Sequence, residues 1–277
     1  MNMTRVGVMQ GRLLPPFEDR FQAFPADQWR QEFDLARDAG LDCIEWIYER
    51  PHETDNPLAS PEGIAEMRAL MDQTGVAVRS ICADYYMTER LIGTDGEANI
   101  PVIDHLHRLI SQAAELSALY IILPFVDQSS LKTGDQRTGI VEVLKELARY
   151  GEDRRVELHL ETDLPPQVFR TLLDAIDHPY VRANFDIGNS ASLGYDPSQE
   201  IGLLAPYLAS VHVKDRLFGG GTVALGTGNA DFVTCFKLIR TTGFARPFIL
   251  QAARGENGQE VELAIRNRTF VEGHMAK

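Results

Sequence analysis

The sequence has few cysteines and no long hydrophobic run. Its cysteines, Cys43, Cys82 and Cys235, are odd in number and irregularly spaced. Such spacing fits neither a disulfide framework nor a zinc ribbon, and it indicates a reducing compartment. No segment approaches the about 20 consecutive apolar residues of a membrane span, and the first residues lack the apolar region and cleavage site of a signal peptide. We therefore expect a cytoplasmic protein with no membrane partner.

Basic residues are scarce relative to acidic ones. The 277 residues include 27 lysines and arginines against 40 aspartates and glutamates, which gives a formal net charge of -13. This mean charge repels the phosphates of DNA and RNA. The sequence therefore predicts that nucleic acid is not a partner.

What the sequence does contain is a regular alternation of short β-rich runs and amphipathic stretches, which is typical of a parallel sheet with crossover helices. The predicted strands are Arg5–Met9, Cys43–Tyr48, Ala77–Cys82, Tyr120–Leu123, Val156–Leu160, Val181–Phe185, Ala209–Val213 and Pro247–Leu250. The predicted helices are Asp27–Asp38, Pro61–Gly75, Pro101–Ser117, Gly139–Tyr150, Pro166–Ile176, Pro197–Leu208, Asp231–Thr242 and Gln259–Phe270.

Eight strands alternating with eight helices favour an α/β fold of the closed (β/α)8 TIM barrel type over an open doubly wound sheet. An open sheet would usually show a glycine-rich nucleotide motif after its first strand, where this sequence reads MQGRLLPP. No linker divides the chain, so we expect a single domain over residues 1–277. The three long irregular stretches, 11–25, 49–59 and 217–229, each follow a strand and are expected at the catalytic face.

Polar residues recur at alternate positions near the ends of the last four strands. Side chains in a strand alternate between the barrel interior and the helix layer. Because the apolar set must face the helices, Glu161, Asp186, His212 and Gln251 are expected to point inward and to meet. Two carboxylates, an imidazole and an amide oxygen form a donor set for a divalent cation. The alternative is a hydrogen-bonded polar cap in which His212 pairs with Asp186.

Other polar residues are expected near the same barrel mouth. Lysine and arginine there suit phosphate or carboxylate groups of a substrate. For Arg216 and Arg254, a solvated salt-bridge cluster is an equal alternative. Glu45 lies deeper in its strand and is expected to be structural. The predicted substrate-binding residues are Gln10, Arg12, Glu49, Lys214, Arg216 and Arg254.

At four motifs the chain resembles the xylose-isomerase-like TIM barrel superfamily, in particular its sugar phosphate isomerase/epimerase branch. The motifs are LETD with Glu161, FDIGN with Asp186, HVKD with His212, and LGTGNADF at 225–232. The resemblance implies a divalent metal held by Glu, Asp, His and a second Glu. Manganese is the expected ion, with magnesium, cobalt and zinc as alternatives. Glu161, Asp186 and His212 match the first three ligand positions.

The fourth ligand position departs from this pattern, because the last strand carries Gln251. Its carbonyl oxygen can bind a metal, but it cannot accept a proton as a base. One negative charge fewer predicts weaker metal binding and stronger polarisation of a substrate carbonyl. The family's frequent Gly-Glu-Gly after the seventh strand is likewise Gly226-Thr227-Gly228 here.

The resemblance implies a sugar or sugar-phosphate isomerase/epimerase that removes a proton α to a metal-bound carbonyl through an enediolate. Glu161 is the expected base, and a metal-bound water, His159 or Lys214 is the expected acid. Without a glutamate at position 251, a two-base epimerisation lacks its second obvious base. The alternatives are a metal-dependent dehydratase or lyase acting on a cyclic polyol-derived ketone, and a non-catalytic relative that binds sugar or metal. Relatives are often dimers or tetramers, so a homo-oligomer is expected.

Overall fold

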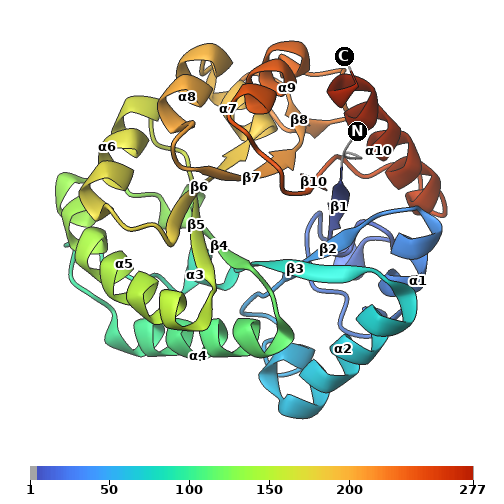
Figure 1. Cartoon of the computed structure of the whole chain (residues 1–277), viewed down its shortest axis with the longest axis horizontal. Helices are drawn as coiled ribbons and strands as arrows, with labels where there is room; N and C mark the ends of the chain where they lie inside the picture. Colours follow the sequence, from blue (N-terminus) through green and yellow to red (C-terminus); the bar gives the residue numbers. More distant parts are fainter. Residues whose placement is uncertain (1–4, 277) are drawn as a thin grey trace.

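Eight parallel strands close into a barrel, as the alternation of elements predicts (Figure 1). The computed structural model describes residues 5–276, and Met1–Thr4 and Lys277 lie outside it. The first residues of the N-terminal stretch, which was searched for a signal peptide, are therefore not described. Pairing of β1 with both the second and the last barrel strand closes the sheet. The barrel strands are β1 (Val6–Met9), β2 (Cys43–Ile47), β3 (Ala77–Cys82), β4 (Tyr120–Phe125), β5 (Glu157–Thr162), β6 (Val181–Asp186), β7 (Leu208–Val213) and β10 (Phe248–Leu250).

A ring of helices surrounds the barrel (Figure 1). These are α1 (Gln31–Asp38), α2 (Pro61–Thr74), α4 (Ile100–Leu116), α5 (Gly134–Arg154), α6 (Pro166–Ile176), α8 (Pro197–Leu204), α9 (Phe232–Thr241) and α10 (Glu260–Met275). Helix α2 begins as predicted, because the Ser60 hydroxyl accepts a hydrogen bond from the Gly63 amide and proline occupies the first turn. It ends at Gly75, whose φ of 76° few other residues adopt. The predicted start of the first helix at Asp27 is wrong, since residues 26–30 form turns and α1 begins at Gln31.

The loops that follow the strands contain short elements that periodicity does not reveal. Helix α3 (Tyr85–Thr88) follows β3, α7 (Ile187–Leu193) follows β6, and β7 leads into the hairpin of β8 (Asp215–Arg216) and β9 (Thr222–Val223). Short 3-10 turns form η1 (Phe17–Asp19), η2 (Pro57–Ala59) and η3 (Asp127–Ser129). These segments are too short for a helical or strand period to be read from sequence.

The interior of the barrel is polar and the helix layer is apolar. On β2, Trp46 packs against Trp29 and Phe33, with ring centroids 5.5 and 6.1 Å away. Its neighbour Glu45 points the opposite way and contacts His212, which lies on the non-adjacent strand β7. The predicted alternation of inward polar and outward apolar side chains is therefore confirmed on this strand. Within residues 5–276, no helix combines the length and apolar character that a membrane crossing would need.

Candidate functional site

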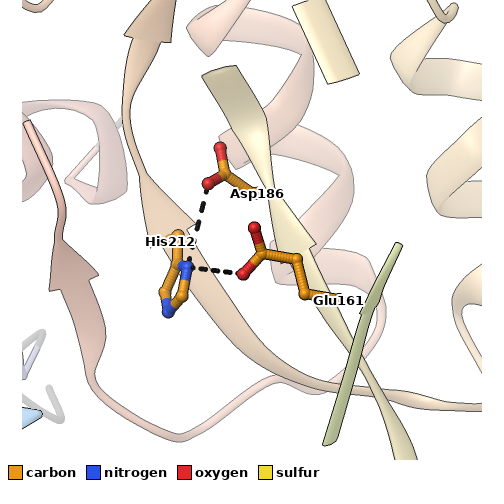
Figure 2. A group of neighbouring side chains, drawn as sticks. All are labelled: Glu161, Asp186 and His212. Atoms are coloured by element: carbon orange, nitrogen blue, oxygen red, sulfur yellow. Dashed lines mark ion pairs between the residues drawn. The ribbon is translucent and has the colours of Figure 1, made fainter. Parts of the chain in front are cut away.

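Three of the four predicted metal ligands meet at the carboxyl ends of neighbouring strands (Figure 2). Glu161 on β5, Asp186 on β6 and His212 on β7 are buried, and one ligand atom from each lies within 4.8 Å of the others. The Nδ1 atom of His212 lies 3.2 Å from Glu161 Oε2 and 3.8 Å from Asp186 Oδ2. A carboxylate–carboxylate–imidazole cluster of this kind suits a divalent cation.

The orientation of His212 is fixed from below by Glu45. Glu45 Oε1 lies 2.6 Å from His212 Nε2, and the Ser80 hydroxyl donates to Glu45 Oε2 over 2.6 Å. Burial opposes a charge on His212, but the attraction of Glu45 and the hydrogen bonds to the carboxylates raise its pKa above the ordinary value. A carboxylate that holds the hydrogen on Nε2 leaves Nδ1 facing the cluster, as in metal-binding histidines.

Amide and ammonium groups hold the two carboxylates in place. Asn184 Nδ2 donates to Glu161 Oε2 over 3.0 Å, and Asn189 Nδ2 donates to Glu161 Oε1 over 2.8 Å. The Asn189 backbone N–H donates to Asp186 Oδ1 over 2.8 Å, which begins α7 directly beneath the site. Each carboxylate is thus oriented before any ligand binds.

Asp186 is further held as an anion by Lys214, whose Nζ lies 2.8 Å from Asp186 Oδ2. Burial alone would raise the pKa of Asp186, but Lys214 and His212 lower it well below the usual range. Asp186 is therefore suited to charge neutralisation and ligation, and it is a poor donor or acceptor of protons in a reaction.

The fourth predicted ligand, Gln251, presents its carbonyl oxygen through a chain of amides. The Arg12 guanidinium can only donate hydrogen bonds. The Gln22 side-chain atom that lies 3.2 Å from Arg12 must therefore be the amide oxygen, Oε1. Gln251 Nε2 donates to this same oxygen over 3.0 Å, and Gln22 Nε2 donates to Asp84 over 2.7 Å. With its nitrogen so engaged, Gln251 leaves a buried Oε1 that has no hydrogen-bond partner.

These residues fit a divalent cation. The donor set comprises the clustered carboxylates of Glu161 and Asp186, the Nδ1 of His212 and the buried Gln251 oxygen, and Gln251 lines the same cavity as Glu161. Buried polar atoms without partners are rare, because each one costs free energy unless a ligand satisfies it. A self-contained polar cap accounts for the contacts of His212 and leaves this oxygen unexplained.

A cavity of about 490 Å³ opens above the cluster. Glu161, Gln251 and the predicted substrate-binding residues Lys214 and Arg216 line it. Its volume is within the range of about 300–1,000 Å³ that small-molecule sites occupy. Residues that we did not single out from the sequence also line this cavity, and they include Gln22, Cys82, Asp84 and Asn189.

Four predicted substrate contacts lie outside the lining of this cavity. Gln10 Oε1 accepts from the Ile47 amide, and both Glu49 oxygens are engaged by Arg20. Arg12 and Arg254 donate to backbone carbonyls, including that of Phe21, over 2.7 and 2.9 Å. In this structure these four therefore hold the 11–25 loop and the strand ends in place, and a contact with substrate stays a prediction for them.

The structure also places His159 below the cavity. His159 Nδ1 lies 2.8 Å from the Ser210 hydroxyl, Nε2 lies 2.8 Å from Glu157 Oε2, and the ring stacks on Tyr120. Burial and the nearby charge of Arg246 lower the pKa of His159 to about 4, against the raising effect of Glu157. This placement does not favour His159 as the acid, because both ring nitrogens have partners and the residue does not line the cavity.

Comparisons with known proteins agree with this architecture. A family model described as the xylose isomerase-like TIM barrel matches residues 33–269. The chain is 25% identical over 268 residues to the L-ribulose-5-phosphate 3-epimerase UlaE of Salmonella paratyphi A, with 92% of this chain and 93% of that protein covered.

Two solved structures share the fold. A D-allulose 3-epimerase from Methylomonas sp. has a TM-score of 0.73 at 15% identity, with 98% of both chains covered. A xylose isomerase-like TIM barrel protein from Mycobacterium smegmatis, in complex with magnesium, has a TM-score of 0.69 at 18% identity, with 99% of this chain and 97% of that chain covered. From the family model, which spans most of the sequence, the chain belongs to the xylose isomerase-like TIM barrel family.

Proposed function

We propose that the protein is a divalent-metal-dependent sugar epimerase or isomerase that moves a proton at the carbon α to a ketose carbonyl. The observation that carries this proposal is the buried cluster of Glu161, Asp186 and His212 beside a cavity of sugar size that Glu161 and Gln251 line. The relative UlaE, which matches along nearly its whole length, is named as a ketose-phosphate 3-epimerase. The Methylomonas protein is likewise named as a 3-epimerase.

In this proposal Glu161 is the base. It lines the cavity, and Asn184 and Asn189 aim its two oxygens. Glu161, Asp186, His212 and Gln251 would hold the cation, with manganese as the expected ion. When bound, the cation would polarise the carbonyl and stabilise the charge of the enediolate.

Lys214 and Arg216 bind the substrate in this proposal. Lys214 lies at 2.8 Å from Asp186, and its ammonium faces the cavity edge where an oxyanion would develop. Arg216 donates to Asn189 Oδ1 over 2.9 Å and to the Gly220 carbonyl over 2.8 Å, which fixes its guanidinium beside the mouth. Such fixed cations suit the hydroxyl or phosphate groups of a small carbohydrate.

We also propose that the enzyme works in the cytoplasm, which the three buried free thiols support. A homodimer or tetramer stays a prediction.

The test is solvent exchange and product analysis with manganese in D₂O. The substrates are L-ribulose, L-ribulose 5-phosphate, D-allulose and D-tagatose, and the variants are Glu161→Gln and, as a matched control from the same strand, Glu157→Gln. We expect an epimer or isomer that carries one solvent deuteron, and a loss of about 10²–10⁴-fold in Glu161→Gln only. Chelation should abolish turnover.

Other outcomes would identify the alternatives. Metal and sugar binding without exchange would indicate a binding protein, and a product that has lost water would indicate a lyase. Either result would overturn the epimerase proposal.

A further inference from the structure

We propose that Asp84 is the second catalytic acid–base group, in place of the carboxylate that position 251 lacks. This inference rests on the proposed epimerase function and explains how that reaction runs with one glutamate. Asp84 follows β3 directly, precedes α3, and lines the same cavity as Glu161. Through Gln22 it is one side chain away from Gln251.

The side-chain hydrogen-bond partners of Asp84 are uncharged, so no cationic partner holds its carboxyl group in the ionised form. Its partners are the neutral amide of Gln22, over 2.7 Å, and the thiol of Cys82, over 3.3 Å. Burial raises the pKa of Asp84 to about 6, partly opposed by these two hydrogen bonds. Asp186, by contrast, is held as an anion by Lys214. A carboxyl group that titrates near neutrality can both give and take a proton.

Two other carboxylates line the cavity, and neither fits this role as well. Asp163 lies two residues beyond Glu161 at the end of the same strand, so it approaches from the same side. It also accepts a hydrogen bond of 2.6 Å from Ser130. Asp127 lies exposed at the rim, in the 3-10 turn after β4. Asp84 follows a different strand from Glu161, and its side chain is partly buried.

The neutral Gln251 and the carboxylate of Asp84 are linked through opposite ends of the Gln22 side-chain amide. Gln22 has one oxygen and one NH₂ group, and it gives the oxygen to Gln251 and the NH₂ to Asp84. A carboxylate at 251 would require the NH₂ of Gln22, which would turn the Gln22 oxygen toward Asp84. The glutamine is therefore what allows Asp84 to be an oriented carboxylate.

The reaction balances with these two groups. The Glu161 carboxylate removes the proton from the carbon α to the carbonyl, and the C–H electron pair forms the enediolate. The Asp84 carboxylic acid then delivers its proton to the other face of that carbon, a new C–H bond forms, and Asp84 is left as the carboxylate. Water in the cavity exchanges protons with both groups and restores the starting state, and the opposite epimer reacts in reverse.

The test separates epimerisation from proton removal. Wild type, Asp84→Asn and Asp84→Glu are assayed with manganese and the four ketoses in D₂O, for the epimer formed and for deuterium in recovered substrate. The matched control is Glu200→Gln, a buried carboxyl outside the cavity that binds Ser190 and whose pKa burial raises to about 7.

We expect Asp84→Asn to lose epimerisation by about 10²–10⁴-fold while Glu161 still exchanges deuterium into one epimer. Asp84→Glu should recover part of the epimerisation, and Glu200→Gln should match wild type. The inference is overturned if Asp84→Asn epimerises at a rate within about tenfold of wild type. It is also overturned if deuterium exchange and epimerisation both fall and KM rises, because that result would mean that Asp84 only binds a substrate hydroxyl. A wild type inactive on every ketose would overturn the proposed function as well, which distinguishes the two failures.

Discussion

Two carboxylate–histidine pairs lie inside this barrel, one beneath the cavity floor and one at the cluster. In the lower pair, His159 binds both Glu157 and Ser210, and Arg246 neutralises Glu157 over 2.8 Å. In the upper pair, Glu45 holds one nitrogen of His212, while the other nitrogen faces two carboxylates. Both pairs consist of a glutamate and a histidine that point into the barrel. In the lower pair, each ring nitrogen of the histidine has a hydrogen-bond partner within the group.

The two groups differ in how far their own contacts satisfy them. The upper group keeps a clustered pair of carboxylates and leaves the Gln251 oxygen without a partner. A buried hydrogen-bond network whose polar atoms all have partners makes the fold more rigid. A network with unpartnered polar atoms is stabilised only when a ligand binds to those atoms. We therefore propose a stabilising role for His159 and metal ligation for His212.

Exchanging each histidine for glutamine should separate the two roles most strongly. His212→Gln removes a proposed ligand, and we expect metal-dependent turnover to fall by at least about 10³-fold. His159→Gln should leave kcat/KM near wild type and lower the free energy of unfolding by about 1–3 kcal/mol, because Glu157 and Ser210 lose a partner. Turnover assays and urea denaturation of both variants test this prediction. If His159→Gln loses as much activity as His212→Gln, the two histidines do not have different roles.

Removing the carboxylate of each pair should give the next largest difference. Glu45→Gln frees the His212 ring, so we expect metal affinity to weaken by about 10–100-fold. Glu157→Gln serves as its matched control, and its metal affinity should equal that of wild type. Calorimetric titration with manganese measures both. Equal affinities in the two variants would show that Glu45 does not orient a ligand.

Restoring a carboxylate at position 251 should strengthen metal binding modestly. In Gln251→Glu the added negative charge should tighten manganese binding by roughly tenfold, or about 1.4 kcal/mol. Epimerisation should nevertheless fall, because Gln22 must reverse its amide toward Asp84. The double variant Gln251→Glu/Asp84→Asn should epimerise at least about tenfold faster than Asp84→Asn alone. A double variant no faster than that single variant would show that positions 251 and 84 are not linked.

The difference in the pH dependence of stability between wild type and His159→Gln should report the lower pair. The pKa of His159 is lowered to about 4, below its unfolded value of about 6.5. The unfolded chain therefore binds more protons between these values, and the stability from neutral His159 is present above about pH 6.5 and is lost as pH falls toward 4. We expect a contribution of at most about 1.4 kcal/mol per pH unit.

The check is the free energy of unfolding between pH 4 and 7 for wild type and His159→Gln. The variant should be less stable and should show a flatter dependence. Identical slopes would mean that His159 is not held neutral.

The barrel and the three clustered side chains could be predicted from the sequence because both depend on alternation. Glu161, Asp186 and His212 end three successive strands with inward parity, and parallel strands end at one face. The same parity also selects His159, because alternation gives the direction of a side chain and not its height in the barrel. Only the contacts with Glu157 and Ser210 distinguish the two histidines.

The remaining cavity residues could not be predicted, since loops carry them. Gln22 lies in the 11–25 stretch, which was expected at the catalytic face, but nothing in its neighbours indicates that it meets Asp84 after β3. Asn189 had a signal in the FDIGN motif, where the Asp186 carboxylate begins α7. Contacts between side chains from separate loops depend on the conformations of those loops, which sequence periodicity does not encode.

The most direct measurement is anomalous diffraction from crystals soaked with manganese. We expect one strong peak bounded by Glu161, Asp186, His212 Nδ1 and Gln251 Oε1, with ligand distances of about 2.0–2.3 Å. No peak should lie beside His159. A site elsewhere, or a peak that excludes the Gln251 oxygen, would contradict the contrast between the two layers of the barrel.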